Sequence, residues 1–293
     1  MAENFGECLS VVENSKSKQS IKEEKITPQF SSSNVKTKNS RNIVANTLLR
    51  RRYELKYCIS EAKAQEVKQF IKHYLQPDPY CKNRPNSAYP LVSLYLDSDN
   101  LRLCRESLAG KKNRFKLRIR SYTDDLEYPR FLEIKRRLNN IIVKSQTPIM
   151  HCNMMPLFLK SHLPPRSSGM DEEAFEQFLL YMKIINAKPV VRIRYLREAW
   201  ENDTKQRVRI TFDRQICYNI DTSINVLLKG GGWQYNDISL NRVILEIKFT
   251  EYYPEWIKRV VAYCNLQQES ISKYATSIQQ ACFLGFRAPQ MLR

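Results

Sequence analysis

Residues 114–136 read RFKLRIRSYTDDLEYPRFLEIKR, and this stretch decides the fold. Apolar and charged residues alternate in its two outer runs, with the period of two that is typical of β-strands. The charged positions of the two runs are Lys116, Arg118, Arg120, Glu133 and Lys135. The stretch therefore predicts two strands, each with one apolar face and one charged face.

The same alternation recurs along most of the chain after residue 50. We predict eight strands, which cover residues 51–59, 90–96, 114–122, 130–136, 141–149, 189–199, 207–213 and 242–249. In several of them the polar face is charged. Arg207 and Arg209 alternate with apolar residues in one strand, and Glu246 and Lys248 do so in another.

Helix signals fill the gaps between these strands. Ser60 is a typical N-cap, and Gly110 is a typical C-terminal glycine for a short second helix. Asp171 opens a third helix, and Pro254 suits the first turn of a fourth. A fifth helix covers residues 272–284. The sequence therefore predicts an α+β fold, in which eight mainly antiparallel strands carry helices on the outside.

The charge of the chain belongs to its folded part. The 293 residues include 48 Lys and Arg against 30 Asp and Glu, a formal net charge of +18. Residues 1–46 are rich in Ser, Lys, Asn and Glu and show no sustained period, so we predict a flexible tail. This tail carries seven Lys or Arg and five Asp or Glu, a net charge of +2. The predicted domain, residues 47–293, therefore carries 18 − 2 = +16.

The composition narrows the class of protein. Apolar residues make up 42% of the chain and aromatic residues 11%. These fractions are too high for a chain that is disordered along its whole length. No apolar stretch approaches the roughly 18–20 residues that span a bilayer, and the first residues lack the pattern of a signal peptide. The eight cysteines are scattered and form no Cys-x-x-Cys pair. We therefore expect a cytoplasmic protein with reduced thiols and no transmembrane segment.

Repeated Lys and Arg on one sheet face repel one another unless an anion lies against them. Closing eight strands leaves a lumen wide enough for side chains and one slim ligand, and a basic lumen would bind a triphosphate or a longer phosphate chain. The alternative is a sheet face exposed to solvent. In the strand 189–199, Arg192 and Arg194 lie opposite Tyr195 and Arg197, so alternation leaves its inward face open.

Carboxylates among these cations would hold a divalent ion, because hard cations prefer oxygen ligands. The candidates on charged strand faces are Glu54, Glu133 and Glu246. Each has the alternative role of an ion pair with a neighbouring Lys or Arg. Glycines 230–232 are not followed by the Gly-Lys-Ser/Thr of a phosphate-binding loop, so we expect side chains to hold the phosphate.

Eight short motifs occur in an order that resembles a known family. They are Arg52-Tyr-Glu-Leu-Lys-Tyr57, Ser93-Leu-Tyr-Leu-Asp97, Lys116-Leu-Arg-Ile-Arg120, Phe131-Leu-Glu-Ile-Lys135, Tyr195-Leu-Arg197, Arg207-Val-Arg209, Leu245-Glu-Ile-Lys248 and Ser272-Lys-Tyr274. Over residues 48–285 the chain resembles the VTC domain, the catalytic part of the vacuolar transporter chaperone complex, and its free-standing bacterial relatives. That domain belongs to the triphosphate tunnel metalloenzyme, or CYTH-like, superfamily. The resemblance implies a closed, antiparallel eight-stranded β-barrel with flanking α-helices.

The resemblance also implies an activity and a site. The VTC domain transfers the γ-phosphate of ATP onto a growing polyphosphate chain, with manganese, or else magnesium, as its divalent metal. The implied catalytic residues are Lys56, Arg118, Arg120, Lys135, Arg197, Arg209 and Lys273. The implied substrate-binding residues are Arg137, Lys144, Tyr195, Lys248 and Ser272. Glu246 would be the metal ligand.

The sequence departs from the superfamily pattern at three positions. Many tunnel hydrolases begin with Glu-x-Glu-x-Lys, but Arg52 stands at the first position here, which removes one metal ligand. Arg137 stands where some relatives have histidine. Ser270 stands where some relatives have a basic residue, which bears on how strongly phosphate binds there.

Three other functions fit parts of the pattern. A tunnel triphosphatase would use water as the acceptor, and the missing first glutamate disfavours it. A non-catalytic polyphosphate-binding accessory protein would keep the basic lining without the metal carboxylate, and Glu246 speaks against it. A nucleic-acid-binding protein is the default for a charge of +16, but no recognised nucleic-acid motif is present. We expect ATP and inorganic polyphosphate as partners, and the sequence leaves open a membrane-protein partner and the oligomeric state.

Overall fold

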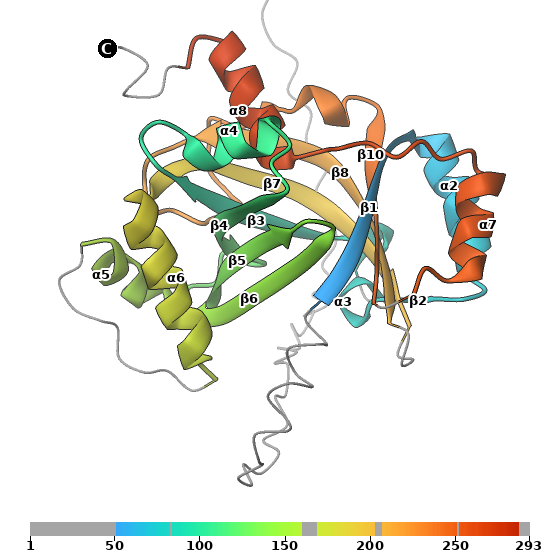
Figure 1. Ribbon diagram of the computed structural model, residues 1–293, viewed down its shortest axis with the longest axis horizontal. Helices are drawn as coiled ribbons and strands as arrows, with labels where there is room; N and C mark the ends of the chain where they lie inside the picture. The colour runs from blue at the N-terminus through green and yellow to red at the C-terminus, as the bar shows by residue number, and fades with distance from the viewer. Residues whose placement is uncertain (1–50, 83, 160–168, 203–206, 251, 287–293) are drawn as a thin grey trace, which may run out of the picture. The chain divides into compact units, whose positions relative to one another are not determined.

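A computed structural model describes residues 51–82, 84–159, 169–202, 207–250 and 252–286. The predicted tail, residues 1–46, lies outside the described residues. Figure 1 shows one large antiparallel sheet with helices packed against its outer surface. The predicted α+β class with antiparallel strands is therefore confirmed.

All eight predicted strands are present. The long strands are β1 (Arg51–Ser60), β3 (Tyr89–Asp97), β4 (Asn113–Ser121), β5 (Arg130–Leu138), β6 (Ile141–Ile149), β7 (Lys188–Glu201), β8 (Val208–Ile220) and β10 (Arg242–Phe249). The sequence did not predict two short strands, β2 (Gln76–Pro77) and β9 (Gln234–Tyr235). Strand β8 continues seven residues beyond its predicted end at Asp213. Alternation breaks there because Gln215 adopts a left-handed φ of 51°, where the register of β8 against β7 shifts.

The strands pair in the order β2-β7-β3-β4-β5-β6-β1-β10-β8-β9, and β8 also pairs with β7. Every pairing between these strands is antiparallel. One junction is much weaker than the rest: β6 meets β1 through only two residue pairs, Arg51 with Val143 and Arg52 with Ile142. The sheet therefore stays open along most of this seam, and the expected closed barrel is not confirmed.

A non-strand segment explains why β6 does not follow β1 further. The free edge of β1 is taken by the residues that precede the last helix. Tyr57 forms an isolated antiparallel bridge with Gln268, and the Glu269 backbone N–H donates to the Lys56 carbonyl at 2.9 Å. Backbone groups on the edge of a strand need partners, and this segment supplies them in place of β6.

The five predicted helices are also confirmed. The described residues contain α2 (Glu61–Ile71), α3 (Pro79–Lys82), α4 (Arg102–Leu108), α5 (Met154–Leu159), α6 (Glu172–Ile185), α7 (Glu255–Tyr263) and α8 (Lys273–Phe283), with 3₁₀ turns at Pro85–Ser87, His151–Asn153 and Asp237–Ser239. The side chains of Ser60, Asp171 and Ser272 cap α2, α6 and α8 by accepting backbone N–H bonds. Helices α3 and α5 were not predicted, because four and six residues are too few to show a helical period.

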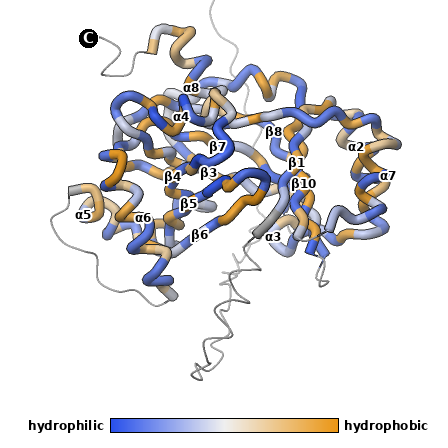
Figure 2. Tube along the Cα trace, in the orientation of Figure 1, coloured by the Kyte–Doolittle hydropathy of each residue, from blue (hydrophilic) through white to orange (hydrophobic). Residues whose placement is uncertain are grey.

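The apolar strand faces and the helices together leave the charged faces free. Helices α2 and α7 pack on β1, β8 and β10 through residues such as Val67, Ile247 and Val260. Helix α6 packs on β4 and β5, and the apolar face of α8 packs against Tyr95 and Tyr195. Hydrophilic and hydrophobic positions alternate along the strands in Figure 2. In the part of the chain that is described, no helix has the length and apolar composition to cross a membrane.

Candidate active site

The charged strand faces meet in one cavity of about 280 Å³. Its lining comes from all eight long strands and from the start of α8. The cations of the lining are Lys56, Lys116, Arg118, Arg120, Lys135, Lys144, Arg197, Arg207, Arg209, Lys248 and Lys273. Among the residues that the structure describes, two carboxylates line the same cavity, Glu54 and Glu246. Eleven cations against two carboxylates make this a site for an anion of high charge.

Twelve of the thirteen predicted site residues line this cavity. The exception is Arg137, whose Nε donates to the Asn139 carbonyl at 2.8 Å at the β5–β6 turn. Arg137 instead lines a neighbouring cavity of about 520 Å³, which it shares with Lys56, Lys135 and Ser272. Sequence reasoning did not include Lys116 in the site, although it stands on the same strand face as Arg118.

Strand register explains why the charges gather. In an antiparallel sheet, directly opposite residues lie on the same face. Lys116 lies opposite Lys135, and Lys135 lies opposite Lys144, so three lysines form one row across β4, β5 and β6. On the other side of the cavity Lys56 lies opposite Glu246. The alternation within each strand therefore becomes a continuous basic surface only through these pairings.

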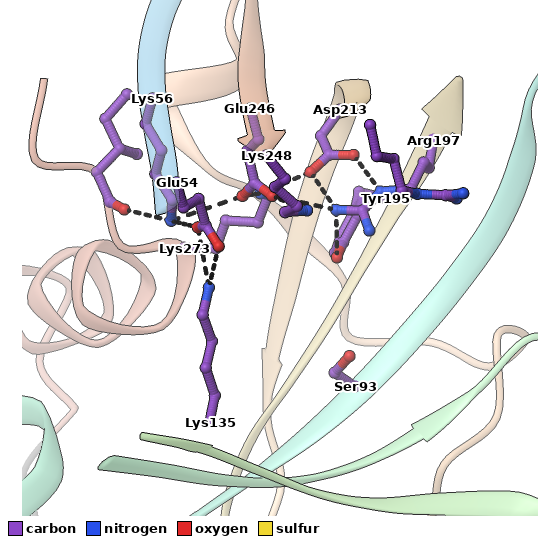
Figure 3. A network of polar contacts seen from close by, with 12 residues as sticks. Glu54, Lys56, Ser93, Lys135, Tyr195, Arg197, Asp213, Glu246, Lys248 and Lys273 are labelled. Atoms are coloured by element: carbon purple, nitrogen blue, oxygen red, sulfur yellow. Dashed lines mark hydrogen bonds and ion pairs between the residues drawn. The ribbon is translucent and has the colours of Figure 1, made fainter. Parts of the chain in front are cut away.

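Glu246 is the centre of the polar network in Figure 3. One carboxylate oxygen is 3.0 Å from the Lys273 Nζ and 3.5 Å from the Lys56 Nζ, and the other is 2.7 Å from the Lys248 Nζ. Burial by itself would raise the pKa of Glu246, but these three ammonium groups and Arg197 hold it well below its usual range. Glu246 is therefore an anion that keeps four cations at fixed positions around the cavity.

Asp213 forms ion pairs with two cations of this network, Arg197 and Lys273. The sequence analysis assigned no role to Asp213. The fully buried carboxylate accepts both Arg197 Nε at 2.7 Å and Arg197 Nη2 at 2.8 Å, and it lies 2.6 Å from the Lys273 Nζ. Burial lowers the pKa of Lys273, but Asp213 and Glu246 outweigh that effect and raise it. Its place on the charged face of β8 was visible in the sequence, but its partners on β7 and α8 were not.

The Glu133 carboxylate has a structural role and does not line the cavity. It is fully buried, and its oxygens lie 2.6 Å from the Arg118 Nε, 2.7 Å from the Lys144 Nζ and 3.6 Å from the Arg120 Nη1. Burial raises its pKa, and Arg118, Arg120 and Lys144 lower it well below the usual range. The ion-pair interpretation of Glu133 is therefore the one that the geometry supports, and Arg118 and Arg120 are held in place by it.

Strand β7 has a definite inward face. Tyr195 and Arg197 line the cavity, and the Arg197 guanidinium lies 5.2 Å from the centroid of the Tyr195 ring. Arg192 and Arg194 point to the other face, where both stack on Trp233, at 5.3 and 4.4 Å from its ring centroid. The inward face of β7 therefore carries Tyr195 and Arg197, and alternation alone did not show which face this would be.

Glu54 on β1 is a second carboxylate in the cavity that could serve as a metal ligand. Glu54 lines the cavity beside Glu246, with Lys135 at 2.7 Å and Lys56 at 3.2 Å. Among the described residues there is no group of three His, Cys, Asp or Glu side chains that could hold a metal ion. One or two carboxylates suit a divalent cation that takes its other ligands from phosphate oxygens and water. Glu246 and Glu54 therefore fit a metal that arrives with a phosphate substrate, and not a metal held by the protein alone.

Lys144 is expected to make the affinity of the cavity for phosphate depend on pH. Burial lowers the pKa of Lys144 to about 8, in spite of the neighbouring Glu133. Its ammonium form attracts phosphate, so this contribution to affinity is present below about pH 8 and is lost above it. We expect Lys144→Arg to reduce the loss of tripolyphosphate affinity between about pH 7 and pH 9 by about fivefold, because arginine stays protonated. Calorimetric titrations of the two proteins at three pH values measure this, and superimposable pH profiles would contradict it.

The fold and the cavity define a class, an antiparallel-sheet protein that surrounds a basic cavity containing two carboxylates. The sequence model of the VTC domain matches residues 51–282, which is more than half of the chain. The chain belongs to the VTC domain family.

Comparison with solved structures gives distant similarities. A Bacillus halodurans protein described as a candidate adenylate cyclase has 12% sequence identity and a TM-score of 0.42, and the match covers 76% of this chain and 95% of that one. The PH1819 protein of Pyrococcus horikoshii has 12% identity and a TM-score of 0.40, with 78% and 99% covered. Similarity at this level carries no argument about function. No curated protein matches the chain in sequence.

Proposed function

We propose that this protein is an ATP-dependent polyphosphate polymerase, which transfers the γ-phosphate of ATP onto the end of a growing inorganic polyphosphate chain. One observation carries the proposal. In a chain of the VTC domain family, eleven Lys and Arg side chains line one narrow cavity, with two carboxylates among them; nine of the eleven come from seven strands, and Lys273 and Arg207 come from α8 and from the residue before β8. This lining suits a slim, highly charged phosphate chain more than a duplex nucleic acid, which is too wide to enter a cavity of about 280 Å³.

The proposed reaction requires electrostatic stabilisation of the transition state and little acid–base catalysis. A terminal phosphate oxygen of polyphosphate is already anionic near neutral pH and is the nucleophile. Two anions must approach one another, and charge must be spread over the transferred phosphoryl group. Fixed cations that need no rearrangement at the moment of reaction lower this barrier most effectively. The network around Glu246, Asp213 and Glu133 holds the cations of this cavity in that way.

The residues divide into roles by position. Arg118, Arg120, Arg197 and Arg209 would bind phosphate oxygens of the nucleotide through the guanidinium N–H groups that their carboxylate partners leave free. Lys56, Lys135, Lys144, Lys248 and Lys273 act as point charges for donor and acceptor phosphates, and Tyr195 and Ser272 add hydroxyl donors. Breaking the β–γ bond of ATP leaves ADP, and the acceptor oxygen forms the new phosphoanhydride bond.

Glu246, with Glu54, would hold the divalent metal, which we propose to be manganese, with magnesium as the alternative. When bound, the metal supplies positive charge that neutralises phosphate oxygens. The proposal rests on the carboxylates that remain in contact with the cavity, since Glu133 and Asp213 are fully buried and committed to ion pairs.

Purified protein incubated with ATP and manganese tests the proposal, with products separated on a polyphosphate gel. We expect a ladder of long chains that depends on the metal. Orthophosphate alone would show a triphosphatase, and tight phosphate-chain binding without turnover would show an accessory binding protein. Either result would overturn the proposal.

Arg209 of β8 and Arg207, just before this strand, provide a matched pair for the same assay. Arg209 lines the cavity and is held by Asp78 and Glu201, both at 2.5 Å. Arg207 lies two residues earlier and also lines the cavity, but at its edge, with 53% of its side chain exposed. We expect Arg209→Ala to lower the rate of polymer formation by about 100-fold, by analogy with the loss of one transition-state donor, and Arg207→Ala to lower it by much less. Equal losses in the two variants would show a general effect of charge instead of a positioned contact.

A further inference from the structure

Lys116 stands in a row of like charges that is only partly neutralised. It lies directly opposite Lys135, which lies opposite Lys144. Lys135 is paired with Glu54 at 2.7 Å, and Lys144 is paired with Glu133 at 2.7 Å. Like charges placed side by side across a sheet are unfavourable, so each member of the row needs an anion.

Lys116 has no such anion within the described part of the chain. No Asp or Glu oxygen of the described residues lies within 4.0 Å of its Nζ, and its hydrogen bond goes to the neutral Ser272 Oγ at 2.7 Å. That hydroxyl oxygen also accepts the Ala275 N–H at the start of α8. Lys116 is thus held in place by α8 while its charge is left uncompensated.

Basic residues surround Lys116 on β1, on β5 and along its own strand, whereas α8 contributes the neutral Ser272. The Asp97 carboxylate of β3 lies near Cys104 of α4, which Lys116 also approaches. Lys56 on β1, Lys135 on β5, and Arg114 and Arg118 on its own strand face it, and Cys104 on α4 lies nearby. Burial lowers the pKa of Lys116 well below its usual range, and these four cations lower it further. An anion placed among them relieves this repulsion and favours the protonated amine.

Lys116 also marks the junction of two cavities. It lines the cavity of about 280 Å³ described above and also the neighbouring cavity of about 520 Å³. Lys56, Lys135 and Ser272 are likewise common to both cavities. The larger cavity adds the next basic row of the sheet, Arg114 opposite Arg137. Basic side chains therefore continue past Lys116 from the lining of one cavity into that of the other, and Glu54 is the carboxylate common to both linings.

We propose that a phosphate chain longer than a triphosphate extends from the smaller cavity into the larger one, and that Lys116 binds the phosphate at the junction. Lys116 is then a residue that sets chain-length preference, and the larger cavity is a subsite for the chain. The inference rests on the proposed function for its substrate class, but it concerns binding and can be decided without turnover.

Calorimetric binding of two probes tests this inference: inorganic tripolyphosphate and a linear polyphosphate several times longer, both without ATP. For Lys116→Met we expect the preference for the longer chain over tripolyphosphate to fall about tenfold, as for the loss of one charge-assisted hydrogen bond. Lys116→Arg should retain most of the preference. Binding of the longer chain should also take up fewer protons in Lys116→Met than in the wild type, measured in two buffers of different ionisation enthalpy.

Lys258→Met is the control for net charge, since Lys258 lies on α7 with 55% of its side chain exposed. It should leave the chain-length preference unchanged. Lys116→Met should unfold at the same temperature as the wild type or higher, because it removes a charge that has no counter-ion. An unchanged preference in Lys116→Met, or an equal fall with both probes, would overturn the inference. These outcomes are independent of whether ATP yields polymer, so failure of the proposed function is seen separately on the gel.

Discussion

Glu246→Gln is expected to reduce metal-dependent polymer formation by about 100-fold or more while binding of tripolyphosphate is retained or becomes tighter. The substitution preserves shape and removes one negative charge from the centre of the cavity. Lys56, Lys248 and Lys273 then lose an anionic partner and offer more of their charge to phosphate. Turnover falls because the carboxylate that would hold the metal is gone.

The separation of binding from turnover is the measurement that matters for Glu246→Gln. Calorimetry gives tripolyphosphate affinity without metal, and the gel assay with manganese gives turnover. Glu255→Gln serves as the matched control, because Glu255 lies on α7 with 65% of its side chain exposed. Undiminished polymer formation in Glu246→Gln would remove Glu246 from the proposed metal site. A parallel loss of binding would show that Glu246 acts only by organising the cations.

Arg118→Ala is expected to abolish polymer formation and also to lower the free energy of unfolding by about 3 kcal/mol. The second effect arises because Arg118 is the nearest partner of Glu133, whose carboxylate is fully buried. Removing the guanidinium leaves that charge with only Lys144 and Arg120. A loss of activity in this variant therefore has two causes, the lost contact with phosphate and the lower stability of the fold.

The double variant Arg118→Ala/Glu133→Gln separates the two effects. Neutralising Glu133 removes the uncompensated buried charge, so we expect stability to recover by about 2 kcal/mol while activity stays lost. Denaturant unfolding of the wild type, both single variants and the double variant completes the cycle. Recovery of polymer formation together with stability would show that Arg118 serves the fold and not the substrate.

The sequence predicted those parts of the fold that depend on residues close together in the chain. Alternation in runs such as 114–122 and 130–136 identified every long strand, since side chains of a strand point to opposite faces with a period of two. Ser60 and Asp171 marked helix starts because their side chains satisfy the free N–H groups of the first turn. The two-residue strands β2 and β9 carry no local period and were not predictable.

The sequence pattern could not predict that β6 pairs with β1 over only two residues, and the reason is different. Alternation says which face a residue takes but not which strand will be its neighbour. The expected closed barrel assumed that every strand edge finds another strand. In the structure, residues 268 and 269 take the free edge of β1, and they come from the far end of the chain.

The candidate site was likewise predictable only in part. Strand alternation placed Lys56, Arg118, Arg120 and Lys135 on one face each, and sheet pairing then brought those faces together around one cavity. Arg137 stands on the same face of β5 as Lys135 but lies at the strand end, so it lines the neighbouring cavity. The residue types and their spacing thus identified most of the lining, but not its extent along each strand.

The amino-acid sequence was enough to identify the eight long strands, the alternation of charged and apolar residues along them and the membership in the VTC domain family. Only the tertiary structure decided the partner of each charge: it commits Glu133 and Asp213 to buried ion pairs, leaves Glu54 and Glu246 in the cavity, and leaves Lys116 without a carboxylate among the described residues. The physical reason is that the direction of a side chain follows from neighbouring backbone, whereas an electrostatic environment is the sum over groups brought close from distant parts of the chain.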